Sequence, residues 1–247
     1  MLGGCGVKKE KEADSELPKI VIGMDYFEPY SYQVSNGEYK GIDVELAKEA
    51  FQRLGYQPKF ENIVWEDKDE LLADGTIDCL WSSYSMNGRE DKYQWAGPYL
   101  YSRQMVVVKN ESEIQTLSDL KGKRIAVQAT TKAEDLFLHN IKSDLPQMQQ
   151  VNCFSTTNEI YAALRKSYVD AIAGHEAMLG SLVKEGKDAY RMLDESIYKS
   201  ELGVAFKKGT HEEVAADLTE TLKKLQREGI TEKIVTKYGL DADEILP

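Results

Sequence analysis

Strand and helix patterns alternate along most of this chain, and that alternation limits its fold more than any other feature. From residue 19 the sequence KIVIGM has the short, β-branched composition of a strand. The next segment, GIDVELAKEAFQRLG, places its apolar side chains on one face of a helix. Such pairs recur up to residue 186, and a long amphipathic helix over 211–229 follows. Repeated β-α-β order predicts an α/β fold with mostly parallel strands.

Composition and periodicity give each predicted element a range. Strands are expected at 19–24, 58–65, 76–81, 103–110, 124–128, 148–154, 169–174 and 201–209. Helices are expected at 41–55, 67–75, 132–142, 157–167, 176–186, 211–229 and 230–239. We expect Asp43 to cap the first of these helices and Gly55 to end it.

Two predicted strands, 103–110 and 201–209, interrupt the alternation because neither has a helix of its own. If they run side by side, they connect two lobes. One lobe is then discontinuous, with residues 18–107 and 202–247, and the other contains residues 108–201. Open α/β sheets bind ligands beyond the carboxyl ends of their strands, so the sequence predicts a ligand cleft between the lobes.

The charge balance narrows the range of partners. The 247 residues include Lys+Arg 31 and Asp+Glu 42, which gives a net charge of -11. Such a chain repels nucleic acid and anionic lipid headgroups, so we expect neither as a direct partner. The longest apolar runs are strand-sized and too short to span a bilayer. A hydrophobic content of 42% is enough for a full-sized core.

The first residues resemble a lipid-attachment motif. Leu2-Gly3-Gly4-Cys5 is similar to a bacterial lipobox, in which the cysteine is lipidated and becomes the mature N-terminus. The charged and apolar leader that precedes a lipobox is missing, so we expect a trimmed or truncated form. A chance Gly-rich start is the alternative. The charge run KKEKEADSE predicts a disordered tether, which leaves residues 1–17 outside the lobes.

The other two cysteines, Cys79 and Cys153, lie in predicted strands that are far apart in the sequence. They belong to no C-x-x-C motif and to no Cys/His cluster, so we expect buried free thiols. For the same reason we expect no zinc site. We also expect no other metal and no cofactor.

A run of hydroxyl side chains and one arginine follow the third predicted strand. Arg89 offers five donors in a planar fork, which suits a two-point grip on a carboxylate. The side chains placed to orient that carboxylate are Ser82, Ser83, Tyr84 and Ser85. The alternative is an ordinary polar loop in which Arg89 forms a structural ion pair.

A second set of polar residues stands at the start of the predicted helix 132–142. Thr130, Thr131 and Lys132 lie where free backbone N–H groups and the helix dipole favour an anion. An ordinary threonine N-cap is the alternative.

A third set, His175 and Glu176, follows the predicted strand 169–174. A carboxylate at this point would pair with an ammonium group, although a glutamate at a helix start is also stabilised by the dipole. The sequence leaves open whether His175 forms hydrogen bonds in a pocket or lies on the surface.

A fourth set combines an acid with aromatic side chains. Asp25, Tyr26, Phe27 and Tyr30 follow the first predicted strand, and Trp65 ends the second. Aromatic walls with one carboxylate suit a ligand side chain that is long, apolar or cationic. Ordinary core packing is the alternative for each aromatic residue.

Together these stretches resemble the bacterial solute-binding proteins of family 3, the extracytoplasmic components of polar amino-acid ABC importers. The similarity extends from residue 18 to residue 240. It is carried by EPYSY, GIDVELAKEA, DGTIDCLWSSYSMNGREDKYQWAGPY, LSDLKGKRIAVQATTKAED, YVDAIAGHEA and ITEKIVTKYG. The resemblance implies a two-lobe, periplasmic-binding-protein-like fold of type II, with two hinge strands and a ligand cleft between the lobes.

The resemblance also implies roles for individual residues. The family's arginine that grips the ligand's α-carboxylate corresponds to Arg89, and its aromatic residue that stacks on the ligand corresponds to Trp65. The family's aspartate for the amino group falls at His175. We therefore expect the neighbouring Glu176 to bind the ammonium group.

Two loops depart from the family pattern. The loop before Arg89 is one residue shorter, so the family's orienting hydroxyl falls at Tyr84 or Ser85. The loop before the helix at 132 usually contains glycine in the family, whereas residues 129–132 read ATTK here.

The resemblance implies a monomeric lipoprotein, anchored outside the cytoplasm, that captures a free amino acid and delivers it to an ABC permease. The acidic residues near the first strand lean towards a polar or cationic amino acid. The chain has no H-E-x-x-H, G-x-x-x-x-G-K-[ST] or G-x-S-x-G motif, and we expect no enzymatic activity. The alternatives are a cyclohexadienyl or arogenate dehydratase-like enzyme, with Glu176 or His175 as general acid, and the sensor domain of a membrane receptor.

Overall fold

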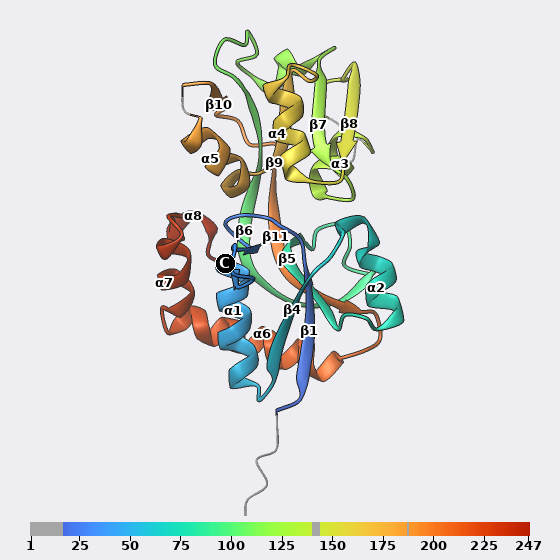
Figure 1. Cartoon of the computed structure of the whole chain (residues 1–247), viewed down its shortest axis with the longest axis vertical. Helices are drawn as coiled ribbons and strands as arrows, with labels where there is room; N and C mark the ends of the chain where they lie inside the picture. Colours follow the sequence, from blue (N-terminus) through green and yellow to red (C-terminus); the bar gives the residue numbers. More distant parts are fainter. Residues whose placement is uncertain (1–16, 140–143, 187) are drawn as a thin grey trace, which may run out of the picture.

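The computed structural model describes residues 17–139, 144–186 and 188–247, and these residues form two lobes joined by two long strands (Figure 1). The predicted lipidation site at Cys5 and nearly all of the predicted tether lie outside the described residues. Among the helices that are described, none is both long enough and apolar enough to cross a membrane.

The first lobe is built on parallel strands that pair in the order β4-β1-β5. These strands are β1 (Lys19–Met24), β4 (Gln57–Asn62) and β5 (Cys79–Ser85), and a small hairpin of β2 (Tyr32–Gln33) and β3 (Tyr39–Lys40) accompanies them. The helices of this lobe are α1 (Ile42–Arg53), η1 (Trp65–Asp67), α2 (Lys68–Asp74), α6 (Glu212–Arg227), α7 (Ile230–Lys237) and α8 (Ala242–Ile245). Along α6 the apolar stripe is buried at Leu218, Leu222 and Leu225, as its period predicts.

The second lobe repeats this plan with parallel strands in the order β9-β7-β8. Its strands are β7 (Arg124–Gln128), β8 (Gln150–Phe154), β9 (Ala171–His175) and the short β10 (Tyr190–Met192). Its helices are η2 (Leu117–Leu120), α3 (Lys132–Phe137), α4 (Thr157–Arg165) and α5 (Glu176–Glu185).

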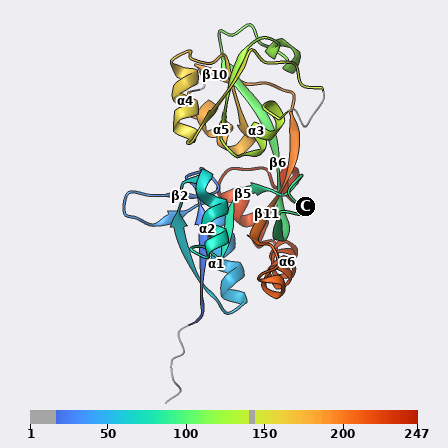
Figure 2. The same ribbon diagram turned by 90° about the vertical axis from the view of Figure 1, so that its right-hand side faces the viewer.

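Two long strands, β6 (Tyr93–Lys109) and β11 (Tyr198–Lys207), run between the lobes (Figure 2). They pair antiparallel with each other as far as Gln104, and from there β6 pairs with β9. One sheet, in the order β4-β1-β5-β11-β6-β9-β7-β8, therefore runs through both lobes. The predicted pair of hinge strands is confirmed, while the lobe bounds at residues 107 and 201 stay predictions.

The hydroxyl side chains before Arg89 lie in β5, so the predicted end of this strand at residue 81 is wrong and Ser82 to Ser85 do not form a loop. The strand continues because Tyr84 and Ser85 pair with β11. The prediction that Asp43 caps α1 is also wrong, since the N-cap residue is Gly41 and the Asp43 side chain turns into the core.

The two described cysteines are free thiols, as predicted, but only one is buried. Cys79 is buried in the first lobe, whereas Cys153 is exposed, because it lies on the edge strand β8, which pairs only with β7. Within the described ranges, no group of three or more His, Cys, Asp or Glu side chains is placed to hold a metal ion.

Candidate ligand-binding site

A cavity lies between the lobes, where the carboxyl ends of β1, β5, β7 and β9 approach one another. The empty space in and around it, open solvent included, is about 330 Å³. It is lined by Asp25, Phe27, Trp65, Ser82, Ser83, Tyr84, Ser85, Gln128, Thr131, Lys132 and His175. The structure therefore places most of the predicted site residues around one space. The predicted residues that do not line it are Tyr26, Tyr30, Arg89, Thr130 and Glu176.

The hydroxyl-bearing part of β5 is held by the buried side chain of Asp43. Asp43 Oδ2 accepts a hydrogen bond from Ser83 N at 2.6 Å, and Oδ1 accepts one from Tyr99 Oη at 2.8 Å. Ser83 has a φ of 51°, a left-handed conformation that is costly for a residue with a Cβ atom. Burial raises the pKa of Asp43 from 3.8 to about 7. Asp43 therefore supports a strained backbone in the cavity wall.

Asp25 is the acidic side chain of the cavity wall, and it already makes a contact across the cleft. Its Oδ2 accepts a hydrogen bond from Gln128 Nε2 of the second lobe at 2.5 Å, and its Oδ1 accepts one from Tyr26 N at 2.7 Å. Burial raises the pKa of the Asp25 carboxyl, and these two hydrogen bonds lower it. Because burial disfavours its charged form, this carboxylate would be stabilised by a cationic ligand group.

The aromatic wall of the cavity contains polar atoms without partners. Trp65 packs edge to face on Tyr84, with ring centroids 5.1 Å apart and an interplanar angle of 89°. Trp65 Nε1 and Ser85 Oγ are buried, and the described residues offer neither of them a hydrogen-bond partner. Buried polar atoms in proteins are nearly always paired, so this wall suits a ligand that brings polar groups.

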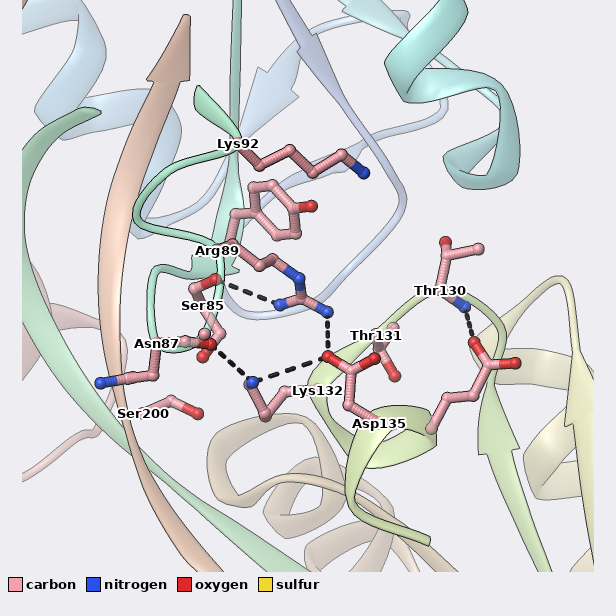
Figure 3. Close-up of polar contacts among 12 residues, drawn as sticks. Ser85, Asn87, Arg89, Lys92, Thr130, Thr131, Lys132, Asp135 and Ser200 are labelled. Carbon is pink, nitrogen blue, oxygen red and sulfur yellow. Dashed lines mark hydrogen bonds and ion pairs between the residues drawn. The ribbon is translucent and has the colours of Figure 1, made fainter. Parts of the chain in front are cut away.

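Arg89 lies beside the cavity and connects the lobes (Figure 3). Its Nη1 donates to the carbonyl of Ser85 at 3.1 Å, and its Nη2 donates to Asp135 Oδ2 of α3 at 2.6 Å. Its Cζ atom lies 5.0 Å from the centroid of the Tyr84 ring, within cation–π range. The side chain is 10% exposed. Arg89 therefore forms an ion pair, and its partner is a carboxylate of the opposite lobe.

Lys132 adds a second cation at the same place (Figure 3). Its Nζ donates to the carbonyl of Asn87 in the first lobe at 2.6 Å and lies 3.5 Å from Asp135 Oδ2. Burial lowers the pKa of Lys132, and the nearby Arg89 lowers it further. We refer to Arg89, Lys132 and Asp135 together as the charged cluster.

The backbone before α3 is strained where the family pattern has glycine. Thr130 has a φ of 58°, and its N–H donates to the side chain of Glu134. Its Oγ1 accepts a hydrogen bond from Lys68 Nζ of the first lobe at 2.8 Å. Lys68 is buried, which lowers its pKa to about 8. The backbone N–H that was predicted to bind an anion at this helix start is therefore already bonded to the Glu134 carboxylate. Of the two threonines, Thr131 lines the cavity and Thr130 does not.

His175 lies at the base of the cavity and is fully surrounded. Its Nδ1 lies 2.9 Å from Ser102 Oγ, and the ring of Phe27 approaches it edge-on at 5.5 Å. Burial lowers its pKa from 6.5 to about 3, so the imidazole is neutral. The sequence left open whether His175 lies in a pocket or on the surface, and the structure places it in the pocket.

Glu176 faces a different hollow. Its carboxylate takes a two-point hydrogen bond from Arg103 of β6, at 2.7 Å to Nε and 2.5 Å to Nη2. The same guanidinium reaches Glu244 of α8 at 3.2 Å. Glu176 lines a second hollow beside α7 and α8. Because Glu176 does not line the first cavity and its carboxylate is paired with Arg103, the geometry does not support its predicted contact with the ligand's ammonium group.

Three contributors to the site were not predicted as site residues. Gln128 lines the cavity, Asp135 pairs with Arg89, and Lys68 bonds Thr130. Gln128 ends its predicted strand, and that position was a usable signal. No sequence pattern marks Asp135 or Lys68, because their partners belong to the opposite lobe.

Comparison with known proteins agrees with this geometry. The family model of the bacterial extracellular solute-binding proteins, family 3, matches residues 20–241, so the chain belongs to this family. Among curated relatives, the L-cystine-binding protein TcyJ of Escherichia coli (strain K12) is 27% identical over 231 residues, which cover 92% of this chain and 85% of that protein. The histidine-binding periplasmic protein of Salmonella typhimurium is 27% identical over 232 residues, which cover 89% and 87%.

Solved structures show the same fold. The substrate binding protein of an amino acid ABC transporter superposes with a TM-score of 0.79 at 27% identity, covering 89% of this chain and 98% of that one. A substrate binding protein of an ABC uptake transporter from Streptococcus pneumoniae, with bound histidine, superposes with a TM-score of 0.80 at 25% identity. The match covers 90% of this chain and 93% of that one. The two-lobe fold of this family is therefore the fold of this chain.

Proposed function

We propose that this protein captures a free amino acid outside the cytoplasm, in the cavity between its lobes, and delivers it to an ABC importer. The observation that carries the proposal is an interlobe cavity that has cations and one acid in or beside its wall, in a chain that belongs to family 3. A free amino acid carries the complementary pair of charges. The names of the relatives, which include cystine- and histidine-binding proteins, agree with it.

The proposal assigns the two charged groups of the ligand to different residues. Lys132 and Arg89 attract the α-carboxylate, and Ser85 offers it an unpaired hydroxyl. Asp25 attracts the ammonium group, in place of the Glu176 expected from the sequence, because Asp25 lines the cavity and Glu176 is paired with Arg103.

The remaining wall residues set the shape of the site. Trp65, Tyr84 and Phe27 enclose the ligand side chain, and Ser83, Thr131 and the neutral His175 offer hydrogen bonds. Binding is coupled to hinge closure, because the cavity residues come from both lobes.

A thermal-shift screen of the twenty common amino acids tests this function, followed by calorimetry on the compound with the largest shift. We expect at least one amino acid to raise Tm by mass action and to bind with one-to-one stoichiometry. Small-angle scattering with and without that ligand reports closure. If none of the twenty raises Tm and calorimetry shows no heat, the proposed function is wrong.

The dehydratase-like alternative has less structural support. It requires an acid at the reacting centre, and the sequence offered Glu176 or His175 for this role. Glu176 is held by Arg103 away from the cavity, and burial lowers the pKa of His175 to about 3, which makes the ring a poor proton donor near neutral pH. An ultraviolet assay with prephenate and arogenate tests it, and we expect no turnover.

The proposal extends to a monomer that is held at the membrane through Cys5. Its support is the lipobox-like sequence of residues 2–5. Expression in a bacterium behind a lipoprotein signal peptide, with labelled palmitate, tests the anchor. We expect label on the parent chain and none on Cys5→Ser, and equal labelling of both refutes the anchor. Size-exclusion chromatography with light scattering tests the monomer.

A further inference from the structure

The charged cluster contains more positive than negative charge. Arg89 and Lys132 both lie against the single carboxylate of Asp135, at 2.6 Å and 3.5 Å. Asp135 cancels one of the two cations, so the cluster keeps one net positive charge. That charge lies at the cavity wall, because Lys132 lines the cavity and is 2% exposed at its side chain.

The rest of the wall keeps one net negative charge. Asp25 is the one acid among the residues that line the cavity in the described part of the chain. His175 adds no charge, since the ring is buried with Ser102 and Phe27 as neighbours. Behind the wall, Lys68 and Glu134 both bond to Thr130, and these opposite charges offset each other.

We propose that Asp135 determines the class of ligand, because it leaves the site with one net cation and one net anion, which match an amino acid whose side chain carries no net charge. This inference rests on the proposed function and makes it more specific. Asp135 acts as a specificity-determining residue without lining the cavity, through Arg89 and Lys132.

Each charged side chain on a ligand meets an obstacle in this arrangement. The α-carboxylate of the ligand takes the one positive charge that Asp135 does not cancel. A second carboxylate on the ligand then meets a cation that is already paired with Asp135. A ligand with a cationic side chain has one acid, Asp25, for two positive groups, and Lys132 repels the second. Charges buried without a partner are strongly disfavoured, so both classes bind more weakly than a neutral side chain of similar size.

The test compares isosteric ligands on the parent and on Asp135→Asn. Glutamine and glutamate, and likewise asparagine and aspartate, differ by one charge at nearly constant shape. On the parent we expect the amino acid with the largest thermal shift to have an uncharged side chain. In Asp135→Asn we expect the affinity for the acidic member, relative to its amide, to rise about tenfold or more by calorimetry, because the spare cation is released.

Two controls keep the outcome interpretable. Asp217→Asn removes an exposed acid from α6 and is expected to leave the acid-to-amide ratio unchanged. Asp135→Ser is the second variant if Asp135→Asn does not fold, as judged by circular dichroism. A parent that prefers glutamate, aspartate, lysine or arginine overturns the inference, and so does an unchanged ratio in both Asp135 variants. A parent that binds no amino acid refutes the proposed function instead, which is a distinguishable result.

Discussion

Two groups of residues in and beside the cavity wall contrast sharply. In the charged cluster, Arg89, Lys132 and Asp135 bring formal charges from both lobes to within 2.6–3.5 Å. Around His175 the wall is neutral, with the rings of Phe27 at 5.5 Å and Tyr30 at 6.4 Å. Charges that meet across a cleft attract strongly only when the lobes close and exclude water. The neutral wall carries no charge, so closing the lobes changes its electrostatic interactions little. Under the proposed function, the charged cluster would couple ligand capture to closure of the lobes, and the neutral wall would contribute shape.

The largest expected effect follows from removing the guanidinium of the charged cluster. Arg89→Ala deletes the ion pair with Asp135 and the bond to the Ser85 carbonyl. Hydrogen bonds of charged groups contribute about 1.5–3 kcal/mol each, so affinity for the best amino acid should fall about 100-fold or more in calorimetry. Lys92→Ala is the matched control, because that exposed lysine forms an ion pair with Asp69, lies over the ring of Tyr93 and does not line the cavity. Equal affinities of parent and Arg89→Ala would show that Arg89 is misassigned.

The second effect tests whether the acid of the wall is as important as its cations. Asp25→Asn keeps an acceptor for Gln128 and removes the charge proposed to bind the ammonium group. We expect affinity to fall about 10-fold or more, by the same range for a charged hydrogen bond. Glu28→Gln, an exposed neighbour, serves as control and should bind like the parent. If Glu28→Gln lowered the affinity as much as Asp25→Asn, the effect would come from the total negative charge of this loop and not from a contact with Asp25.

A third effect concerns the two buried titratable groups, whose pH dependences have opposite signs. The folded pKa of Asp43 is raised from 3.8 to about 7, so its contribution to the free energy of unfolding falls as pH rises through that window. The folded pKa of His175 is lowered from 6.5 to about 3, so its contribution is lost as pH falls through that window. Each slope amounts to about 1.4 kcal/mol per pH unit, and in the parent the two largely cancel.

Removing one of these groups should expose the slope of the other. Relative to the parent, Asp43→Asn should lose stability on acidification, and His175→Gln should gain it. Urea unfolding at about pH 4.5, 5.5 and 6.5 measures both slopes. Stability curves of the variants that run parallel to the parent's would contradict the assignment of these buried groups.

The smallest effect is a gain in stability at the start of α3. Thr130 is β-branched and holds a φ of 58°, which asparagine adopts more readily. Thr130→Asn keeps a side-chain acceptor for Lys68, and we expect it to raise the free energy of unfolding by about 1 kcal/mol. Thr131→Asn is the control, because its φ of -96° carries no such strain. Equal changes in both variants, measured by urea unfolding, would refute the strain argument.

The fold could be predicted because local patterns and global topology agree. The strand 124–128 has the same bounds in the sequence prediction and in the structure, since a short β-branched run between turn signals has few alternatives. Polar residues at strand ends identified most of the cavity wall for a similar reason, because parallel strands direct their carboxyl ends to one edge.

The partners of those residues could not be predicted, because they depend on how the lobes meet. Asp135 reads as an ordinary acid in the first turn of a helix, and only the closed arrangement brings it to Arg89. Asp43 reads as a helix cap for the same local reason, although the packing of Tyr99 and Ser83 draws it into the core. Glu176 was predicted from its position after a strand, but its carboxylate is paired with Arg103 and lines the second hollow instead of the cavity.

The shared sheet has a mechanical consequence. Because β6 and β11 pair with each other between the lobes, opening can proceed as bending and twisting of a two-stranded ribbon whose hydrogen bonds stay intact. The polar contacts that join the lobes, such as Arg89 with Asp135 and Asp25 with Gln128, would break in such a motion, so single substitutions there would shift the balance between an open and a shut molecule.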